Sequence, residues 1–175
     1  FLFRLLQTAS AAESCRSTPR TKDDILRIVR EDSRMGRQGG TRLKLTAHTD
    51  GASRGNPGPA AFGFTIEKDG VVVENGGEYI GEATNNIAEY KAFVAALERM
   101  KELGASEVVV YSDSELAVRQ INGVYRVRNA GLMPLFERVK DLLEAFRSWK
   151  VVHVTRDKNS LADGLANKAL DKQLK

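Results

Sequence analysis

The order of strand and helix patterns from residue 42 onward constrains the fold more than any other feature of this sequence. Three segments with strand patterns come first, and helix and strand patterns then alternate to the end. Such an order predicts a mixed five-stranded sheet flanked by helices, an α/β domain over residues 41–175. The predicted strands are 42–50, 61–67, 71–79, 107–112 and 149–155, and the predicted helices are 86–103, 114–122, 132–147 and 161–173.

Local signals support several of these segments. The step Asp69-Gly70 between two strand patterns is typical of a tight hairpin. Apolar residues recur at spacings of three and four through 86–103, and Gly104 then ends the helix pattern. The segment 107–112 is apolar in its middle, as expected of a central strand buried on both faces.

Residues 1–40 are predicted to form a flexible N-terminal extension outside that domain. Within it, 22–35 has the pattern of one short amphipathic helix, and 36–40 ends in Gly-Gly and resembles a linker. Because the chain begins with Phe1, we expect a fragment or a processed form. Two interpretations of the Arg- and Ser-rich residues 1–21 stay open: a remnant of an upstream region, which we favour, and a cleaved organelle-targeting leader.

Composition excludes several classes of protein. The single cysteine, Cys15, excludes an internal disulfide framework and a cysteine-based zinc site. No run approaches the ~18 apolar residues of a membrane span, so we expect no membrane partner. We expect a cytoplasmic location, unless residues 1–21 are a targeting leader. The net charge of +4 suits a polyanionic partner without identifying one.

Four acidic residues stand in four separate, recognisable contexts. Asp50 ends a predicted strand and Asp113 directly follows another, while Glu89 lies in the first turn of a predicted helix and Asp163 near the start of the last one. Ends of parallel strands meet at one sheet edge, and helix N-terminal turns can lean over it. Four converging carboxylates would repel one another unless cations joined them. The pattern therefore predicts a site for hard divalent metals and phosphate chemistry.

The segments around these acids form four motifs, which are Thr49-Asp50-Gly51 with Gly55-Asn56-Pro57-Gly58-Pro59, Thr84-Asn85-Asn86 with Glu89, Ser112-Asp113-Ser114, and Asn159 with Asp163. Together they resemble the motifs of type 1 ribonuclease H, in the family's order. Any one motif would be a weak signal, but four in order over most of the domain are specific.

The resemblance implies endonucleolytic hydrolysis of the RNA strand of RNA–DNA hybrids, leaving 5′-phosphate and 3′-hydroxyl ends. It assigns Asp50, Glu89, Asp113 and Asp163 as catalytic residues and metal ligands. The expected cofactor is Mg²⁺ or Mn²⁺, with two ions per site when substrate is bound. Two such ions, ~3.5–4 Å apart, activate the attacking water and stabilise the leaving oxygen.

The resemblance also implies a set of substrate contacts. An amide can donate to and accept from an RNA 2′-hydroxyl, which suits Asn56, Asn85 and Asn86 on the nucleic-acid face. Thr84 matches the family's phosphate-binding threonine. We also place Ser114, Arg156 and Asn159 among the candidate contacts, although Ser114 could equally cap a helix. We expect the protein to be monomeric.

Three features depart from the family's pattern. Arg156 stands nearest the position of a mobile histidine, and arginine cannot shuttle a proton at neutral pH, so it could only hold or release phosphate. Glu82 replaces an arginine beside the DNA-phosphate pocket, and the segment 123–131 is a short stand-in for a basic protrusion. Some short-loop relatives also accept double-stranded RNA, which we carry as a second candidate substrate.

The same residues allow other interpretations. Taken singly, Asp50 could be a turn residue, Glu89 and Asp163 ordinary helix acids, and Asp113 a helix N-cap. A non-catalytic nucleic-acid-binding module on the same fold is the main alternative, although carboxylates facing phosphates would not help binding alone. A phosphatase with an aspartate nucleophile would need an Asp-x-Asp pair, whereas Asp50 is followed by Gly51-Ala52.

Overall fold

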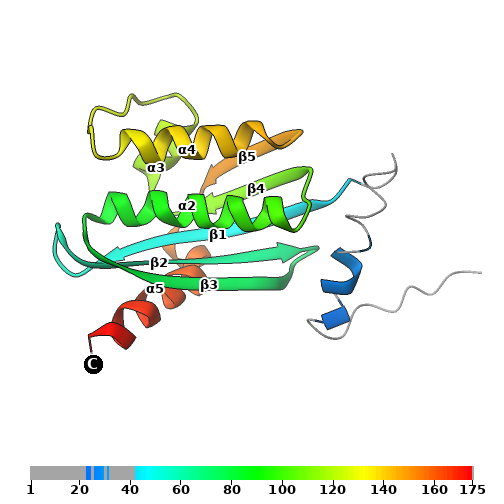
Figure 1. Ribbon diagram of the computed structural model, residues 1–175, viewed down its shortest axis with the longest axis horizontal. Coiled ribbons are helices and arrows are strands. Elements are labelled where there is room, and N and C mark those ends of the chain that lie inside the picture. Colours follow the sequence, from blue (N-terminus) through cyan, green and yellow to red (C-terminus); the bar gives the residue numbers. More distant parts are fainter. Residues whose placement is uncertain (1–22, 25, 30, 32–41, 175) are drawn as a thin grey trace, which may run out of the picture.

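The computed structural model describes residues 23–24, 26–29, 31 and 42–174. They form a five-stranded mixed sheet flanked by helices, as the sequence predicts (Figure 1). The strand order is β3-β2-β1-β4-β5. The strands are β1 (Lys44–Ser53), β2 (Gly58–Lys68), β3 (Val71–Ala83), β4 (Glu107–Ser112) and β5 (Ser148–His153).

The sheet changes character at β1. Strands β1, β2 and β3 form an antiparallel meander, whereas β4 and β5 run parallel to β1. The turn between β2 and β3 contains Asp69 and Gly70, both with positive φ (52° and 79°), as the Asp-Gly signal predicts. Because β1, β4 and β5 are parallel, their carboxyl ends share one edge, where open α/β sheets bind ligands.

Helices cover both faces of the sheet (Figure 1). α2 (Asn85–Glu102) packs on β1 and β2, and α4 (Met133–Glu144) packs against α2. α3 (Glu115–Ile121) contacts both of these helices. α5 (Ser160–Gln173) packs on the other face, over β1, β2 and β3. The predicted apolar stripe of α2 forms the centre of the core: Tyr90, Phe93, Leu97 and Met100 are at most 1% exposed.

Several boundaries differ from the prediction. β1 continues to Ser53, so Asp50 lies inside the strand and does not end it as predicted. Gly51 pairs with Phe62 on β2, and this ladder pairing keeps the glycine in the sheet. The short 3-10 helix η1 (Arg156–Asn159) was not predicted, and β5 begins one residue earlier than expected.

Part of the predicted N-terminal extension contributes to the core. The described residues among 23–31 are helical, in agreement with the predicted short helix. Val29 is fully buried within the main core cluster, and Leu26 packs against that cluster. The predicted linker 36–40 and residues 1–21 lie outside the described residues. The division of the chain at residue 40 stays a prediction.

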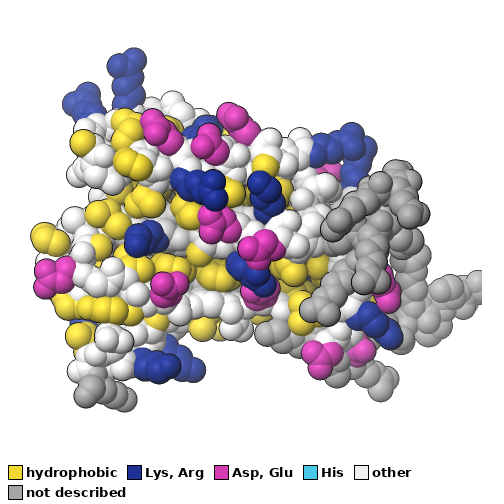
Figure 2. Space-filling model, viewed as in Figure 1, with side chains coloured by type: hydrophobic (Ala, Val, Ile, Leu, Met, Phe, Trp, Pro, Cys, Tyr) yellow, Lys and Arg dark blue, Asp and Glu magenta, His cyan; other side chains and the backbone are white. Residues whose placement is uncertain are grey.

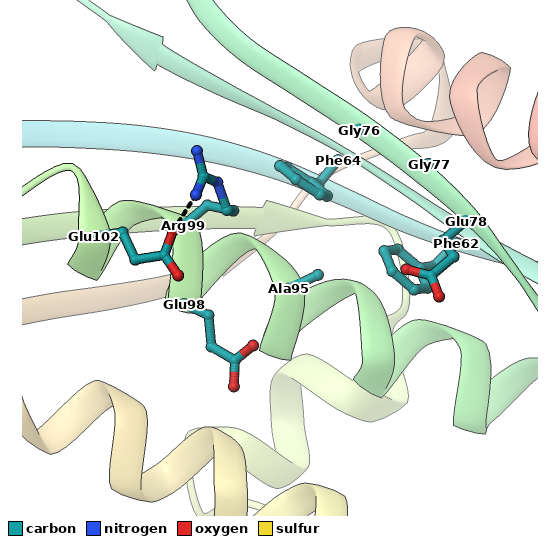
Figure 3. Close-up of a pocket in the computed structure, with 9 residues that line it drawn as sticks. All are labelled: Phe62, Phe64, Gly76, Gly77, Glu78, Ala95, Glu98, Arg99 and Glu102. Atoms are coloured by element: carbon teal, nitrogen blue, oxygen red, sulfur yellow. Dashed lines mark hydrogen bonds and ion pairs between the residues drawn. The ribbon is translucent and has the colours of Figure 1, made fainter.

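The face that carries α2 and α4 shows acidic and basic side chains interspersed over the helices, with hydrophobic side chains between them (Figure 2). A surface pocket of about 320 Å³ lies on α2, β2 and β3, lined by the rings of Phe62 and Phe64 and by Glu98, Arg99 and Glu102 (Figure 3). Arg99 binds Glu74 at 2.7 Å and so joins α2 to β3. None of the predicted site residues lines this pocket. Within the described residues, no helix is both long and apolar enough to cross a bilayer.

Candidate active site

The register of two parallel strands brings Asp50 and Asp113 together. The ladder between β1 and β4 ends with Thr49 opposite Ser112, and the two aspartates follow directly. The meeting of their carboxylates therefore results from backbone pairing and does not depend on a mobile loop. The sequence predicted this convergence, although it placed Asp50 at the end of its strand.

A close approach between β1 and α2 adds Glu89. This glutamate is the fifth residue of α2, so it lies in the second turn and not in the first turn as predicted. A Cβ added at Gly51 would lie only 2.2 Å from the Glu89 backbone nitrogen and 2.5 Å from the Ala88 carbonyl carbon. Glycine is therefore required where α2 crosses β1. The predicted strand 42–50 stops just before Gly51, whereas this glycine belongs to β1.

The three carboxylates form a compact oxygen cluster. One carboxylate oxygen from each of Asp50, Glu89 and Asp113 lies within 4.8 Å of the other two. Asp50 and Glu89 are each only 4% exposed. The Glu89 Oε2 atom is buried without a hydrogen-bond partner among the described residues. A buried, unpartnered carboxylate oxygen beside two further hard oxygen donors fits a divalent cation such as Mg²⁺ or Mn²⁺.

The electrostatics of the cluster favour the same interpretation. Burial, followed by the neighbouring Asp113, raises the pKa of Asp50 to about 8. Burial, followed by Asp50 and Asp113, raises the pKa of Glu89 well above its usual value, although hydrogen bonds from Gly51 and Asn85 oppose this. The protein scaffold thus holds together carboxyl groups that repel one another when ionised. A bound cation would reverse these shifts.

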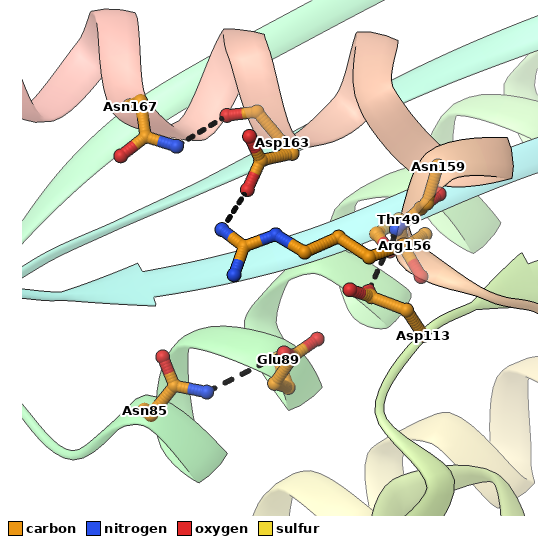
Figure 4. A network of polar contacts seen from close by, with 8 residues as sticks. All are labelled: Thr49, Asn85, Glu89, Asp113, Arg156, Asn159, Asp163 and Asn167. Carbon is orange, nitrogen blue, oxygen red and sulfur yellow. Dashed lines mark hydrogen bonds and ion pairs between the residues drawn. The ribbon is translucent and has the colours of Figure 1, made fainter.

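Asp163 lies beside this cluster but is not one of its three members. Its Oδ1 atom accepts a hydrogen bond from the Arg156 guanidinium at 2.5 Å (Figure 4). The positive charge of Arg156 lowers the pKa of Asp50, against the larger effects that raise it. The guanidinium therefore acts on the cluster as well as on Asp163. The structure brings Arg156, which was predicted as a phosphate contact, to the acidic site itself.

Asn159 is buried behind Asp113. Its Nδ2 group donates to Asp113 Oδ1 at 2.8 Å and to the Thr49 carbonyl at 2.9 Å, so both amide hydrogens are used. The residue is 1% exposed. We predicted a substrate contact here, but the buried amide instead contacts the protein, in a position to orient the Asp113 carboxylate. This partner could not be found from spacing, because Asp113 is 46 residues away in the chain.

The remaining predicted contacts lie at the N-termini of two helices. Thr84 caps α2 by accepting from the Ile87 amide, and Ser114 caps α3 by accepting from the Ala117 amide.

The three predicted amide contacts also lie at or near the start of α2. The amide oxygen of the exposed Asn56 accepts from the Asn85 backbone at 3.2 Å. Asn85 donates from its side chain to Glu89 at 3.4 Å (Figure 4). Asn86 is partly exposed in the first turn of α2. The turn between β1 and β2 and the start of α2 thus form one polar surface next to the acids.

The chain is similar to known proteins in both sequence and structure. A family model described as "Reverse transcriptase-like" matches residues 48–169. Ribonuclease HI of Halobacterium salinarum is 42% identical over 149 residues, which are 85% of this chain and 71% of that protein. The crystal structure of RNase H1 from the same archaeon gives a TM-score of 0.72 at 44% identity, covering 74% of this chain and 99% of that one. LC11-RNase H1, solved in complex with an RNA/DNA hybrid, gives 0.72 at 41% identity, covering 75% and 99%.

Proposed function

Because this chain belongs to the ribonuclease HI family, we propose that its acidic cluster hydrolyses the RNA strand of RNA–DNA hybrids. The chain is a ribonuclease H, an endonuclease. The observation that carries the proposal is the oxygen cluster of Asp50, Glu89 and Asp113 at the carboxyl edge of the parallel strands. A relative of similar structure, LC11-RNase H1, was solved with an RNA/DNA hybrid, which supports this substrate class. The expected products carry 5′-phosphate and 3′-hydroxyl ends.

Asp50, Glu89 and Asp113 would hold divalent cations, and Asp163 would complete the ligand set from α5. We propose two ions, Mg²⁺ or Mn²⁺, with substrate bound. Such ions activate water for attack on the phosphodiester and neutralise the charge that develops on phosphate and leaving oxygen. The protein contributes rigid placement, since these four residues lie on or next to paired strands and packed helices.

The polar surface beside the cluster would bind the hybrid. Since the Asn56 oxygen accepts from the Asn85 backbone, its NH₂ group is the donor that it can offer to a 2′-hydroxyl. Asn85 and Asn86 lie at the N-terminus of α2, where backbone N–H groups also favour an anionic phosphate. Thr84, which caps this helix, would contact the same phosphate.

The proposal also covers the extent of the catalytic domain, the oligomeric state and a second substrate. Residues 41–175 would form the catalytic domain, to which the helical residues near Val29 add buried surface. The enzyme would act as a monomer. Double-stranded RNA is a second candidate substrate, because the Glu82 carboxylate would repel a DNA phosphate at a position where an arginine would attract it.

The direct test is cleavage of a labelled RNA–DNA hybrid, compared with double-stranded RNA, double-stranded DNA and single-stranded RNA. We expect cuts in the RNA strand that stop in EDTA and return when Mg²⁺ or Mn²⁺ is added back. Binding to hybrid that persists in EDTA, without cleavage under any condition, would instead support a non-catalytic binding module. Cutting of duplex RNA at a comparable rate would widen the substrate class.

Removing the Asn159 amide tests whether it orients Asp113. In Asn159→Ala, Asp113 Oδ1 and the Thr49 carbonyl lose their shared donor. We expect kcat/KM on the hybrid to fall about 10- to 100-fold, with weaker divalent-ion affinity measured by titration, as for other residues that orient metal ligands.

The matched control is Asn167→Ala, which removes an amide from α5, the helix that directly follows Asn159; this amide donates to the Asp163 backbone carbonyl. We expect its activity to stay within about 3-fold of wild type. Equal losses in the two variants would mean that Asn159 acts through general stability and not through Asp113.

A further inference from the structure

Arg156 and a divalent cation would compete for the same carboxylate, that of Asp163. The Arg156 Nη2 atom lies 2.5 Å from Asp163 Oδ1, and the two groups form a charge-assisted hydrogen bond. Arg156 belongs to η1 and Asp163 to the first turn of α5, so this ion pair joins two adjoining elements. The Arg156 side chain is 75% exposed and that of Asp163 only 24%. The carboxylate is therefore the more buried partner, whereas the long, exposed arginine side chain can move away into solvent.

The guanidinium lies over the acidic cluster and does not point away from it. Figure 4 shows the Arg156 side chain extended between Asp163 on one side and Glu89 and Asp113 on the other. Its charge interacts favourably with Asp50 and Asp113 as well as with Asp163. Arginine keeps this charge at every accessible pH and has no acceptor atom with which to bind a cation.

A guanidinium bound to a carboxylate weakens the binding of a divalent ion there, because the two positive charges repel each other and compete for the lone pairs of the same oxygen. We propose that Arg156 is a built-in competitor of the second cation: it occupies Asp163 until the ion displaces it, and so sets how tightly that ion binds. This inference rests on the proposed metal site. It gives Arg156 a role in setting cation affinity, in place of the proton-transfer role that arginine cannot perform.

The exchange would also prepare the site for substrate. Once released from Asp163, the exposed guanidinium could pair with another anion. The phosphates of a bound nucleic acid would supply such anions. Cation binding and phosphate binding would then favour each other through one side chain. The competition itself needs no nucleic acid, and it can be measured without turnover.

The test is a titration of the full chain with Mn²⁺ alone, at constant ionic strength and without nucleic acid, following the electron paramagnetic resonance signal of the free ion. We expect Arg156→Gln to bind Mn²⁺ about 2- to 10-fold more tightly than wild type, because a partly exposed ion pair and a nearby positive charge are removed. Arg156→Lys, which keeps the charge but loses the planar fork, should lie between them.

The matched control is Arg54→Gln, which removes the same charge from an ion pair with Asp171 on the same helix. We expect its Mn²⁺ affinity to equal that of wild type. Unchanged or weaker binding in Arg156→Gln, or equal tightening in both variants, would overturn the inference. If Asp50→Asn binds Mn²⁺ as wild type does, the proposed metal site fails and the inference fails with it. If only Asp50→Asn loses binding while Arg156→Gln is unchanged, the site stands and the competition alone is rejected.

Discussion

Asp50→Asn is expected to abolish hybrid cleavage while making the metal-free protein more stable. Asp50 is the member of the cluster that interacts with Asp113, Glu89 and Asp163 alike. Losing its charge would remove a central metal ligand, and several kcal/mol of lost transition-state stabilisation corresponds to about 10³-fold or more in rate. The same change removes a buried carboxylate that repels its neighbours. Function and stability should therefore respond in opposite directions.

The effect on stability depends on pH in a defined direction. The pKa of Asp50 is about 8 in the folded protein and 3.8 as a reference for the unfolded chain. Between these values the folded state binds the proton that the unfolded state has lost, so stability decreases as pH rises from about 4 to about 8. Above pH 8 the full penalty of burying the ionised group is present. Glu89 acts in the same direction, because its pKa is also raised.

Thermal unfolding in EDTA at pH 5 and pH 8 measures this dependence. Wild type should melt at a lower temperature at pH 8 than at pH 5, and Asp50→Asn should narrow the difference. We expect the variant to gain about 1–3 kcal/mol of unfolding free energy at pH 8, since each pKa unit corresponds to ~1.4 kcal/mol and relaxation reduces the full value.

The control variant is Asp171→Asn, which removes an exposed carboxylate from α5 on the side that faces Arg54. It should keep cleavage and gain no stability at pH 8, because a solvent-exposed ion pair contributes ~0–1 kcal/mol. Measurable cleavage by Asp50→Asn at rates near wild type would remove Asp50 from the catalytic set. A lower melting temperature of that variant at pH 8 would contradict the repulsion argument.

The sequence predicted those parts of the fold whose signals are local. The repeat of apolar residues through Tyr90, Phe93 and Leu97 marks α2, and Asp69-Gly70 marks the hairpin, because each pattern is complete within one segment. The four acids could be located for a related reason. Each lies in a distinctive local context, and the predicted alternation of elements brings strand ends to one edge.

The parts that escaped prediction depend on partners far away in the chain. β1 continues through Gly51 because β2 pairs with it, and no property of the Gly/Pro-rich segment itself reveals this. The bond between Asn159 and Thr49 joins residues 110 positions apart. Arg156 meets Asp163 only because an unpredicted turn of 3-10 helix precedes α5. Positions of this kind require the tertiary structure, and they decide how the acids are held.

Gly51→Ala is expected to damage both folding and catalysis, although it adds only one methyl group. The new Cβ would lie 2.2 Å from the Glu89 nitrogen and 2.5 Å from the Ala88 carbonyl carbon. Both are backbone atoms, so no side-chain rotation relieves the overlap and α2 must move away from β1. Overpacking of this kind lowers the free energy of unfolding by about 1–3 kcal/mol or more. A shift of Glu89 by ~1 Å from Asp50 would reduce kcat about 10²-fold.

The matched variant is Gly164→Ala, the same chemical change at a position with open space around the added Cβ. Gly164 lies inside α5, where alanine is favoured over glycine by ~0.5–1 kcal/mol, so this variant should melt higher and still cleave. Urea unfolding and hybrid cleavage, measured on both variants, separate general stability from placement of Glu89. Wild-type stability and activity in Gly51→Ala would contradict this argument, because α2 could then move away from β1 without loss of stability or cleavage. Near-normal stability with lost cleavage would mean instead that the glycine is needed for the distance between Glu89 and Asp50, and not for folding as such.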